Sequence, residues 1–123
     1  MGALARDIMG GGTSAGQAKA MNGRVASAVS AAGTVLSDAT ALNATVSRVS
    51  TVAASSGVRL FNGEIGDEME VYNAGANTLT VYPHASTGTI NQLSAGTGVL
   101  LAQYSVCKFR RITSTAWLAH LGA

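Results

Sequence analysis

Charged side chains are scarce in this sequence. Asp, Glu, Lys and Arg make up 11% of its 123 residues, against roughly 25% in an average soluble domain. The formal net charge is only +2 at pH 7, and so small an excess gives no basic field that would steer nucleic acid to the surface. We therefore expect no specific nucleic-acid partner. We also expect much of the surface to be covered by copies of the same chain or by a larger scaffold.

Cysteine and long apolar runs are also lacking. The single cysteine, Cys107, cannot form an intramolecular disulfide, so folding in a reducing cytoplasm is expected. No apolar run reaches the roughly 18 residues that a membrane span needs, and the first residues lack the apolar stretch of a signal peptide. The sequence predicts neither secretion nor a membrane partner.

Groups of residues that could bind a metal or catalyse a reaction are missing as well. Neither His84 nor His120 has a second ligand-type residue at metal-binding spacing. Glu68 and Glu70 alternate on one face of a predicted strand and project outward, so a metal site is not expected there. Cys107 alternates with Phe109 and is predicted to be a small buried hydrophobic residue. We expect no catalytic residue, no cofactor and no metal, and therefore no enzyme.

The N-terminal part differs from the rest in composition. A glycine-rich stretch at residues 10–12 disfavours helix, and residues 1–14 are predicted to form a flexible arm. Val25, Val29, Ala32 and Leu36 recur at three- and four-residue spacing, which predicts a short helix with one weak apolar stripe. The sequence thus predicts a partly helical N-terminal arm over residues 1–36 and a body over residues 37–123.

The body has the pattern of an all-β domain. A strand is predicted over residues 46–53, with a bulge that keeps Val49 and Val52 on useful faces. After Gly57, short apolar runs are separated by turn residues at intervals of roughly ten. Glu68–Asn73 and residues 78–82 alternate strictly and are joined by a turn at 74–77, so they are predicted to form a hairpin. Further strands are predicted at 58–61, 89–91, 99–102, 105–112 and 116–121. The expected fold is an antiparallel β-sandwich or a jelly-roll-like barrel.

Several side chains are candidates for contacts with other subunits or with a scaffold. Lys108, Arg110 and Arg111 form one basic patch, and Lys108 and Arg110 are expected to meet acidic side chains of another subunit or a capsid surface. Trp117 is a candidate for either the core or a subunit contact. The predicted interface set is Arg6, Arg24, Glu68, Glu70, Tyr72, Lys108, Arg110 and Trp117.

Several short motifs follow one another in order between residues 38 and 119. The most specific part is the succession Asn-Ala-Gly-Ala-Asn, Val-Tyr-Pro and Ile-Asn within residues 73–91. The accompanying residues are Gly57-Val58-Arg59-Leu60, Gly66-Asp67-Glu68, Val71-Tyr72, Leu79-Thr80, Phe109 and Trp117. Together they resemble a small β-module of virion structural proteins of tailed bacteriophages, a family that includes capsid decoration (cement) proteins and fibre-associated proteins. One departure is Phe61, where such modules often have proline.

The resemblance implies a homotrimeric decoration protein on the outside of a tailed-phage capsid, made in the cytoplasm of the bacterial host. Its partners would be its own copies and the major capsid protein. We expect residues 1–36 to bind capsid subunits or adjacent trimers and residues 44–121 to form the trimeric body. One alternative is a trimeric tail- or head-fibre protein. A carbohydrate-binding module is another, with Tyr72, Tyr82, Tyr104 and Trp117 as its aromatic residues.

Overall fold

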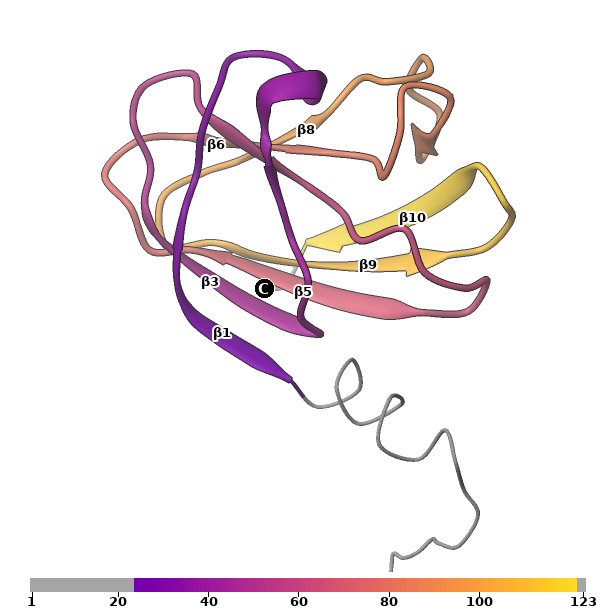
Figure 1. The fold of residues 1–123 in the computed structure, drawn as a ribbon, viewed down its shortest axis with the longest axis horizontal. Helices are drawn as coiled ribbons and strands as arrows, with labels where there is room; N and C mark the ends of the chain where they lie inside the picture. Colours follow the sequence, from indigo (N-terminus) through magenta and orange to yellow (C-terminus); the bar gives the residue numbers. More distant parts are fainter. Residues whose placement is uncertain (1–23, 122–123) are drawn as a thin grey trace, which may run out of the picture.

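A computed structural model describes residues 24–121 as a mainly β protein. The described part holds ten strands and one single-turn 3-10 helix, arranged in two layers (Figure 1). The predicted β-rich character is confirmed. The elements are β1 (Val25–Ser30), η1 (Leu36–Asp38), β2 (Thr40–Ala41), β3 (Val46–Thr51), β4 (Gly57–Arg59), β5 (Glu68–Asn73), β6 (Leu79–Tyr82), β7 (Thr89–Ile90), β8 (Val99–Leu101), β9 (Val106–Arg111) and β10 (Ala116–Leu121).

The first six strands wind as a coil between two sheets. Sheet A has six strands in the order β1-β3-β5-β9-β10-β7, and sheet B has four in the order β2-β4-β6-β8. Each strand up to β6 lies in the sheet opposite to that of its predecessor. Within each sheet, these strands pair in parallel. This is the winding of a β-solenoid, in which stacked turns share one core.

The last part of the chain closes this coil with mostly antiparallel strands. β9 is antiparallel to both β5 and β10, and β8 is antiparallel to β6. β7 adds a short parallel pairing to β10 at the edge of sheet A. The expectation of an antiparallel sandwich or jelly-roll-like barrel is therefore wrong for β1 to β6, whose neighbours are parallel.

The predicted hairpin between β5 and β6 is also wrong, because the two strands belong to different sheets. The turn between them is a corner that is held by the buried side chain of Asn73. The Asn73 amide donates to the carbonyls of Asn77 (2.8 Å) and Leu101 (2.9 Å), and its oxygen accepts from the amide of Gly75 (2.9 Å). These bonds turn the chain away from β5 and into sheet B.

The helix expected around Val25 and Leu36 is wrong as well. Val25–Ser30 is strand β1, which pairs with β3 and so joins sheet A although it falls within the predicted arm segment 1–36. Its valine and serine content suits extended chain next to a neighbouring strand better than an isolated helix. The predicted arm at 1–14 lies outside the described residues.

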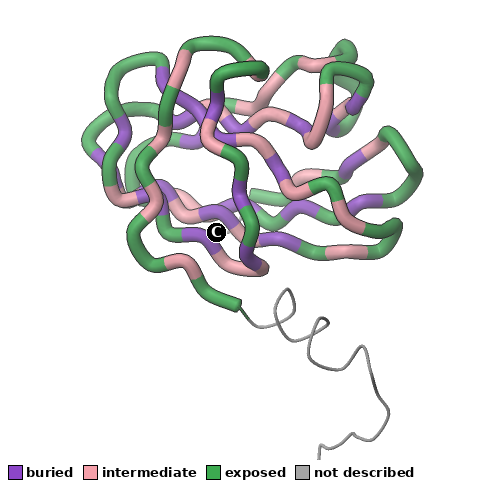
Figure 2. Tube along the Cα trace, in the orientation of Figure 1, coloured by how far each residue is buried: buried purple, intermediate pink, exposed green. Residues whose placement is uncertain are grey.

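The core lies between the two sheets. Figure 2 shows buried stretches alternating with exposed ones along the strands of both layers. The predicted inward side chains Met69 and Val71 on β5 and Leu79 and Val81 on β6 are all buried, as the period of two in a pleated strand requires. The other large side chains of the core are Leu42, Val49, Val52, Val58, Leu60, Ile90, Leu101, Phe109 and Trp117.

Candidate functional site

The outer face of sheet A brings together four of the predicted interface residues. β5 and β9 are neighbours, so Glu68 lies opposite Arg110 and Glu70 lies opposite Lys108. The Arg110 Nη2 and Glu68 Oε2 atoms are 2.7 Å apart in an ion pair that is more than half exposed. An exposed pair of this kind contributes about 0–1 kcal/mol. The charges that were expected to meet across subunits thus already face each other within one chain.

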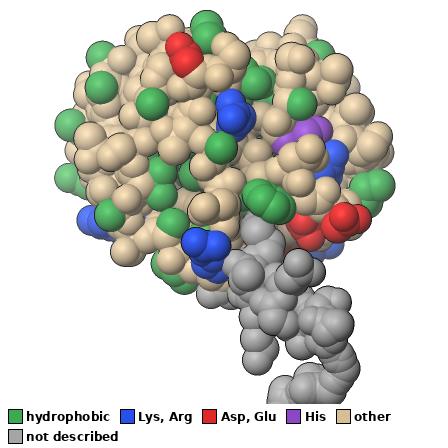
Figure 3. Space-filling model, in the orientation of Figure 1, with side chains coloured by type: hydrophobic (Ala, Val, Ile, Leu, Met, Phe, Trp, Pro, Cys, Tyr) green, Lys and Arg blue, Asp and Glu red, His purple; other side chains and the backbone are tan. Residues whose placement is uncertain are grey.

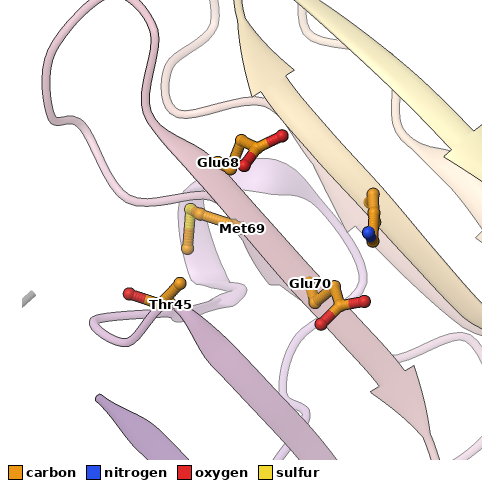
Figure 4. A pocket seen from close by; sticks show the side chains of 5 residues that line it. Thr45, Glu68, Met69 and Glu70 are labelled. Carbon is orange, nitrogen blue, oxygen red and sulfur yellow. The ribbon is translucent and has the colours of Figure 1, made fainter. Parts of the chain in front are cut away.

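A shallow pocket opens beside this charged row. Figure 4 shows Glu68, Met69 and Glu70 on β5 with Thr45 at the start of the neighbouring strand, and Lys108 completes the lining. The pocket has a volume of about 100 Å³, which is below the roughly 300–1,000 Å³ of small-molecule sites. It is therefore a shallow depression in a charged surface, and it is too small for a drug-sized ligand.

Tyr72 and Arg24 complete the predicted set within the described residues. Tyr72 is half-buried on the outer face of sheet A, opposite Arg48 on β3 and Val106 on β9. Arg24 is exposed, and its carbonyl accepts from the amides of Thr45 (3.0 Å) and Val46 (3.1 Å). Arg6 lies outside the described residues.

Arg111 is buried, so the predicted basic patch consists of Lys108 and Arg110 alone. The Arg111 side chain is only 7% exposed. Its guanidinium donates to Asn62 Oδ1 (2.9 Å), to the carbonyl of Gly63 (2.9 Å), and to the carbonyls of Thr113 and Ser114. All of these acceptors are neutral. Arg111 therefore ties the loop before β5 to the loop between β9 and β10, where it is a structural residue.

Arg111 also contacts the half-buried His84 and the buried Trp117, which are hydrogen-bonded to each other. Trp117 Nε1 donates to His84 Nδ1 at 2.9 Å, and Arg111 Nη2 lies 3.2 Å from His84 Nε2. The Arg111 guanidinium carbon lies 5.9 Å from the Trp117 ring centroid, within cation–π range. Trp117 is 1% exposed, so of its two predicted placements the core is the one observed.

The surroundings of His84 favour the neutral imidazole. Trp117 Nε1 donates to Nδ1, which accepts only when it carries no proton, and an imidazolium would place an N–H group against this donor. Burial lowers the pKa of His84, and the nearby Arg111 charge lowers it further. In this environment His84 serves as a neutral partner for Trp117.

A signal for Arg111 was present in the sequence. Cys107, Phe109 and Arg111 recur every second residue along β9, and all three are buried. The same alternation that predicted a buried Cys107 therefore places Arg111 on the inward face. The alternation was outweighed by the charge of Arg111, because an arginine for which the sequence shows no carboxylate partner is expected at the surface.

Cys107 lies in the core, as predicted. Burial raises the pKa of its thiol, although a hydrogen bond with the backbone of His120 acts in the opposite direction. Across residues 24–121, no three His, Cys, Asp or Glu side chains gather in a group able to hold a metal ion. None of the helices in this range has the length and apolar character to cross a membrane.

The free edge of β1 is a further candidate interface. Within residues 24–121, β1 is the outermost strand of sheet A, and its sequence, Val-Ala-Ser-Ala-Val-Ser, contains neither charge nor proline. Charged residues and proline are common devices that keep an edge strand from pairing with another chain. Two register shifts interrupt the pairing of β1 with β3, one between Ala26 and Val29 and one between Val29 and Ser30, and the Arg48 guanidinium donates to the carbonyl of Ser27 (3.0 Å).

Comparison with known proteins adds no family to these observations. A scan against protein-family models finds no match, and neither the curated proteins nor the solved structures contain a significant match to this chain. Its function has to be inferred from the side chains and strand edges described above.

Proposed function

We propose that this chain is a structural protein of a tailed-phage virion, a homotrimeric decoration protein that binds the major capsid protein on the outside of the shell. The observation that carries the proposal is the uncharged free edge of β1. Such an edge offers backbone donors and acceptors to a further strand, which is a common mode of subunit addition. The resemblance of residues 38–119 to virion β-modules gives the assembly its identity.

The arrangement of charge favours the same function. On the outer face of sheet A, Glu68 and Arg110 pair within the chain and Glu70 lies opposite Lys108, so acid and base are matched along β5 and β9 and a copy of this face would meet little net charge there. In the strands of sheet B, the only charged residue is Arg59, whose guanidinium donates to the carbonyls of Leu36 (3.3 Å) and Ser37 (3.4 Å). On the face of the molecule drawn in Figure 3, charged side chains cover only a small part of the surface. A surface with so little charge suits extended contact with neighbouring subunits.

Each subunit supplies a body of two facing sheets. The sandwich or jelly-roll-like module implied by the resemblance enters the proposal in this coarser form, because β1 to β6 wind in parallel. Such a body presents two broad faces, and among the edge strands of its described sheets (β1, β7, β2 and β8) β1 is the longest, with six residues. The β1 edge is then available for self-association and the faces for contact with the shell.

The test begins with the mass of the native full-length protein. We expect native mass spectrometry to give a trimer, and we expect Ala28→Lys on the β1 edge to shift the protein towards monomer. Ala102→Lys is the matched control, since Ala102 is also exposed but directly follows β8, which belongs to sheet B. A wild-type protein that stays monomeric at high concentration would contradict the trimer.

A second measurement addresses the shell. We expect the purified protein to co-sediment with phage capsids stripped of decoration protein and to occupy them in many copies per particle. Occupancy by only a few copies would favour the fibre alternative. No binding to capsids would overturn the proposed function.

A further inference from the structure

A groove runs over the outer face of sheet B, away from the charged face of sheet A. Its volume is about 470 Å³, within the roughly 300–1,000 Å³ typical of small-molecule sites. It contains no charged side chain. The residues that line it are Thr34, Ala54, Ser55, Asn77, Thr78, Thr80, Tyr82 and Leu100.

The Tyr82 ring forms one wall and lies low against the sheet. A Cβ atom added to Gly57 would stand 2.7 Å from Tyr82 Cε2, and one added to Gly98 would stand 3.1 Å from Cδ1. The two glycines therefore leave the space that the ring fills. Its hydroxyl donates to the carbonyl of Thr34 at 3.1 Å, which fixes the ring's orientation without using a side chain of the groove.

Three hydroxyls of the lining, on the exposed Ser55 and Thr78 and the half-buried Thr80, are available to a ligand. The hydroxyls of Ser55, Thr78 and Thr80 form no hydrogen bond with any other described residue. Unpaired hydroxyls gathered along one groove are available to a ligand that both donates and accepts hydrogen bonds. Ser55 also has a φ of 63°, a conformation that non-glycine residues adopt infrequently and that recurs at binding sites.

Hydrogen bonds hold the part of the groove that Asn77 lines. The Asn77 side-chain amide donates to the carbonyl of Val52 at 2.8 Å. The Asn77 carbonyl in turn accepts from the buried Asn73 side chain, also at 2.8 Å. These bonds hold the corner between β5 and β6, so little order has to be imposed on it when a ligand binds.

We propose that this groove binds a neutral saccharide made of hexopyranose units. The C–H face of a pyranose ring packs on an aromatic ring such as Tyr82, and its hydroxyls exchange hydrogen bonds with the three free hydroxyls. Leu100, 73% exposed and opposite Thr80 in the pairing of β8 with β6, adds apolar contact. A charged ligand would find no counter-charge here, and a wholly apolar one would bury these hydroxyls without partners.

The four aromatic residues considered from the sequence do not form one platform. Trp117 is buried in the core, and Tyr72 lies on the outer face of sheet A. Tyr104 is exposed in the loop after β8 and does not line the groove. Tyr82 alone supplies the aromatic surface, so the site accommodates one sugar ring on it, with neighbouring units along the hydroxyls.

The experiment uses the full-length protein and a printed array of neutral and sialylated glycans. We expect binding to neutral hexose-containing glycans and weaker binding to their sialylated forms. Isothermal titration with the strongest neutral glycan of the array then measures the affinity. Silence across the array overturns the proposal, whether or not the protein forms trimers, so this outcome is distinct from failure of the proposed virion function.

Substitutions locate the site. We expect Tyr82→Ala to weaken binding by roughly tenfold or more and Thr80→Val by roughly threefold to tenfold. Tyr104→Ala and Thr87→Val, which alter the same residue types outside the groove, leave the affinity unchanged. Thr80→Val keeps its shape, so it tests the groove even if Tyr82→Ala unfolds. Glycan binding that survives both groove changes contradicts the site, and so does a groove variant that loses capsid occupancy while keeping glycan binding.

Discussion

The outer faces of the two sheets differ in how many charged side chains they carry and in how these are paired. The strands of sheet A place Glu68, Glu70, Lys108 and Arg110 outward on two adjacent antiparallel strands, where acid faces base. Those of sheet B carry the single charge of Arg59 and present Tyr82 and free threonine hydroxyls. On one face Glu68 and Arg110 thus pair within the chain and Arg48 adds a further charge on β3, whereas the strands of the other face have almost none. Of the two openings described on these faces, the groove over sheet B has the larger volume.

The layer between the two faces is where a substitution has its largest expected effect. Trp117→Ala removes the largest fully buried side chain and its hydrogen bond to His84. We expect the free energy of unfolding to fall by about 3–5 kcal/mol, measured by denaturant unfolding. Leu118→Ala alters the exposed neighbour and should change stability by no more than about 0.5 kcal/mol. Equal effects of the two would contradict the core placement of Trp117.

Two adjacent arginines sharpen the contrast between the inside and the outside of sheet A. Arg111→Met leaves the carbonyls of Gly63 and Ser114 without their donor, so we expect a loss of about 2–3 kcal/mol. Arg110→Met breaks only the exposed pair with Glu68 and should cost about 0–1 kcal/mol. Thermal and denaturant unfolding of both variants give the comparison. A larger loss for Arg110 would reverse the assignment of faces.

The glycine beneath Tyr82 tests the outer face of sheet B. In Gly57→Ala, the new methyl group meets the Tyr82 ring and the carbonyl oxygen of Thr80, 2.8 Å away. We expect a loss of about 1–3 kcal/mol from overpacking. The loss should be smaller in a Tyr82→Ala background, because one of the two clashes is then absent. An unfolding series over the four proteins measures this coupling, and strict additivity would mean that the ring does not lie over Gly57.

The smallest expected effect is a dependence of stability on pH through His84. Its pKa in the folded protein is lowered by burial and by Arg111, whereas in the unfolded chain it stays near its ordinary value of about 6.5. Below that pH, the unfolded state binds the proton more readily than the folded one, so stability falls as the pH drops towards the folded pKa. Above it, the contribution of His84 is constant.

The measurement compares the free energy of unfolding between about pH 7.5 and 5, where unperturbed carboxylates stay largely ionised. His84→Gln serves as the control and should lack this part of the pH dependence. A wild-type protein whose stability rises on acidification through this range would contradict a neutral His84.

The sequence predicted which side chains point inward better than it predicted which strands lie next to each other. Alternation placed Met69 and Val71 inward on β5 and Phe109 inward on β9 correctly, since a pleated strand has a fixed period of two. It could not tell that β5 and β6 separate at a corner, because that depends on the hydrogen bonds of the buried Asn73. The spacing of four between Val25 and Val29 fits one face of a helix or of a strand, and only the neighbour β3 selects the strand.

The candidate sites divide in the same way. The outward position of Glu68 and Arg110 followed from their strands, but their mutual pairing needed the register of β5 against β9. The groove over sheet B had no signal along the chain, since its lining comes from segments as far apart as Thr34 and Leu100. Side chains so distant in sequence meet only when the sheets form.

The sequence by itself determined a β-rich chain with little charge, a core of aliphatic side chains and the inward or outward sense of most strands. Composition and a two-residue period are local properties, so they can be read without a partner strand. Only the tertiary structure decided that the first six strands coil in parallel, that Arg111 is buried, and that Tyr82 lies over two glycines. Each of these depends on contacts between distant segments, whose free energy belongs to the assembled sheets.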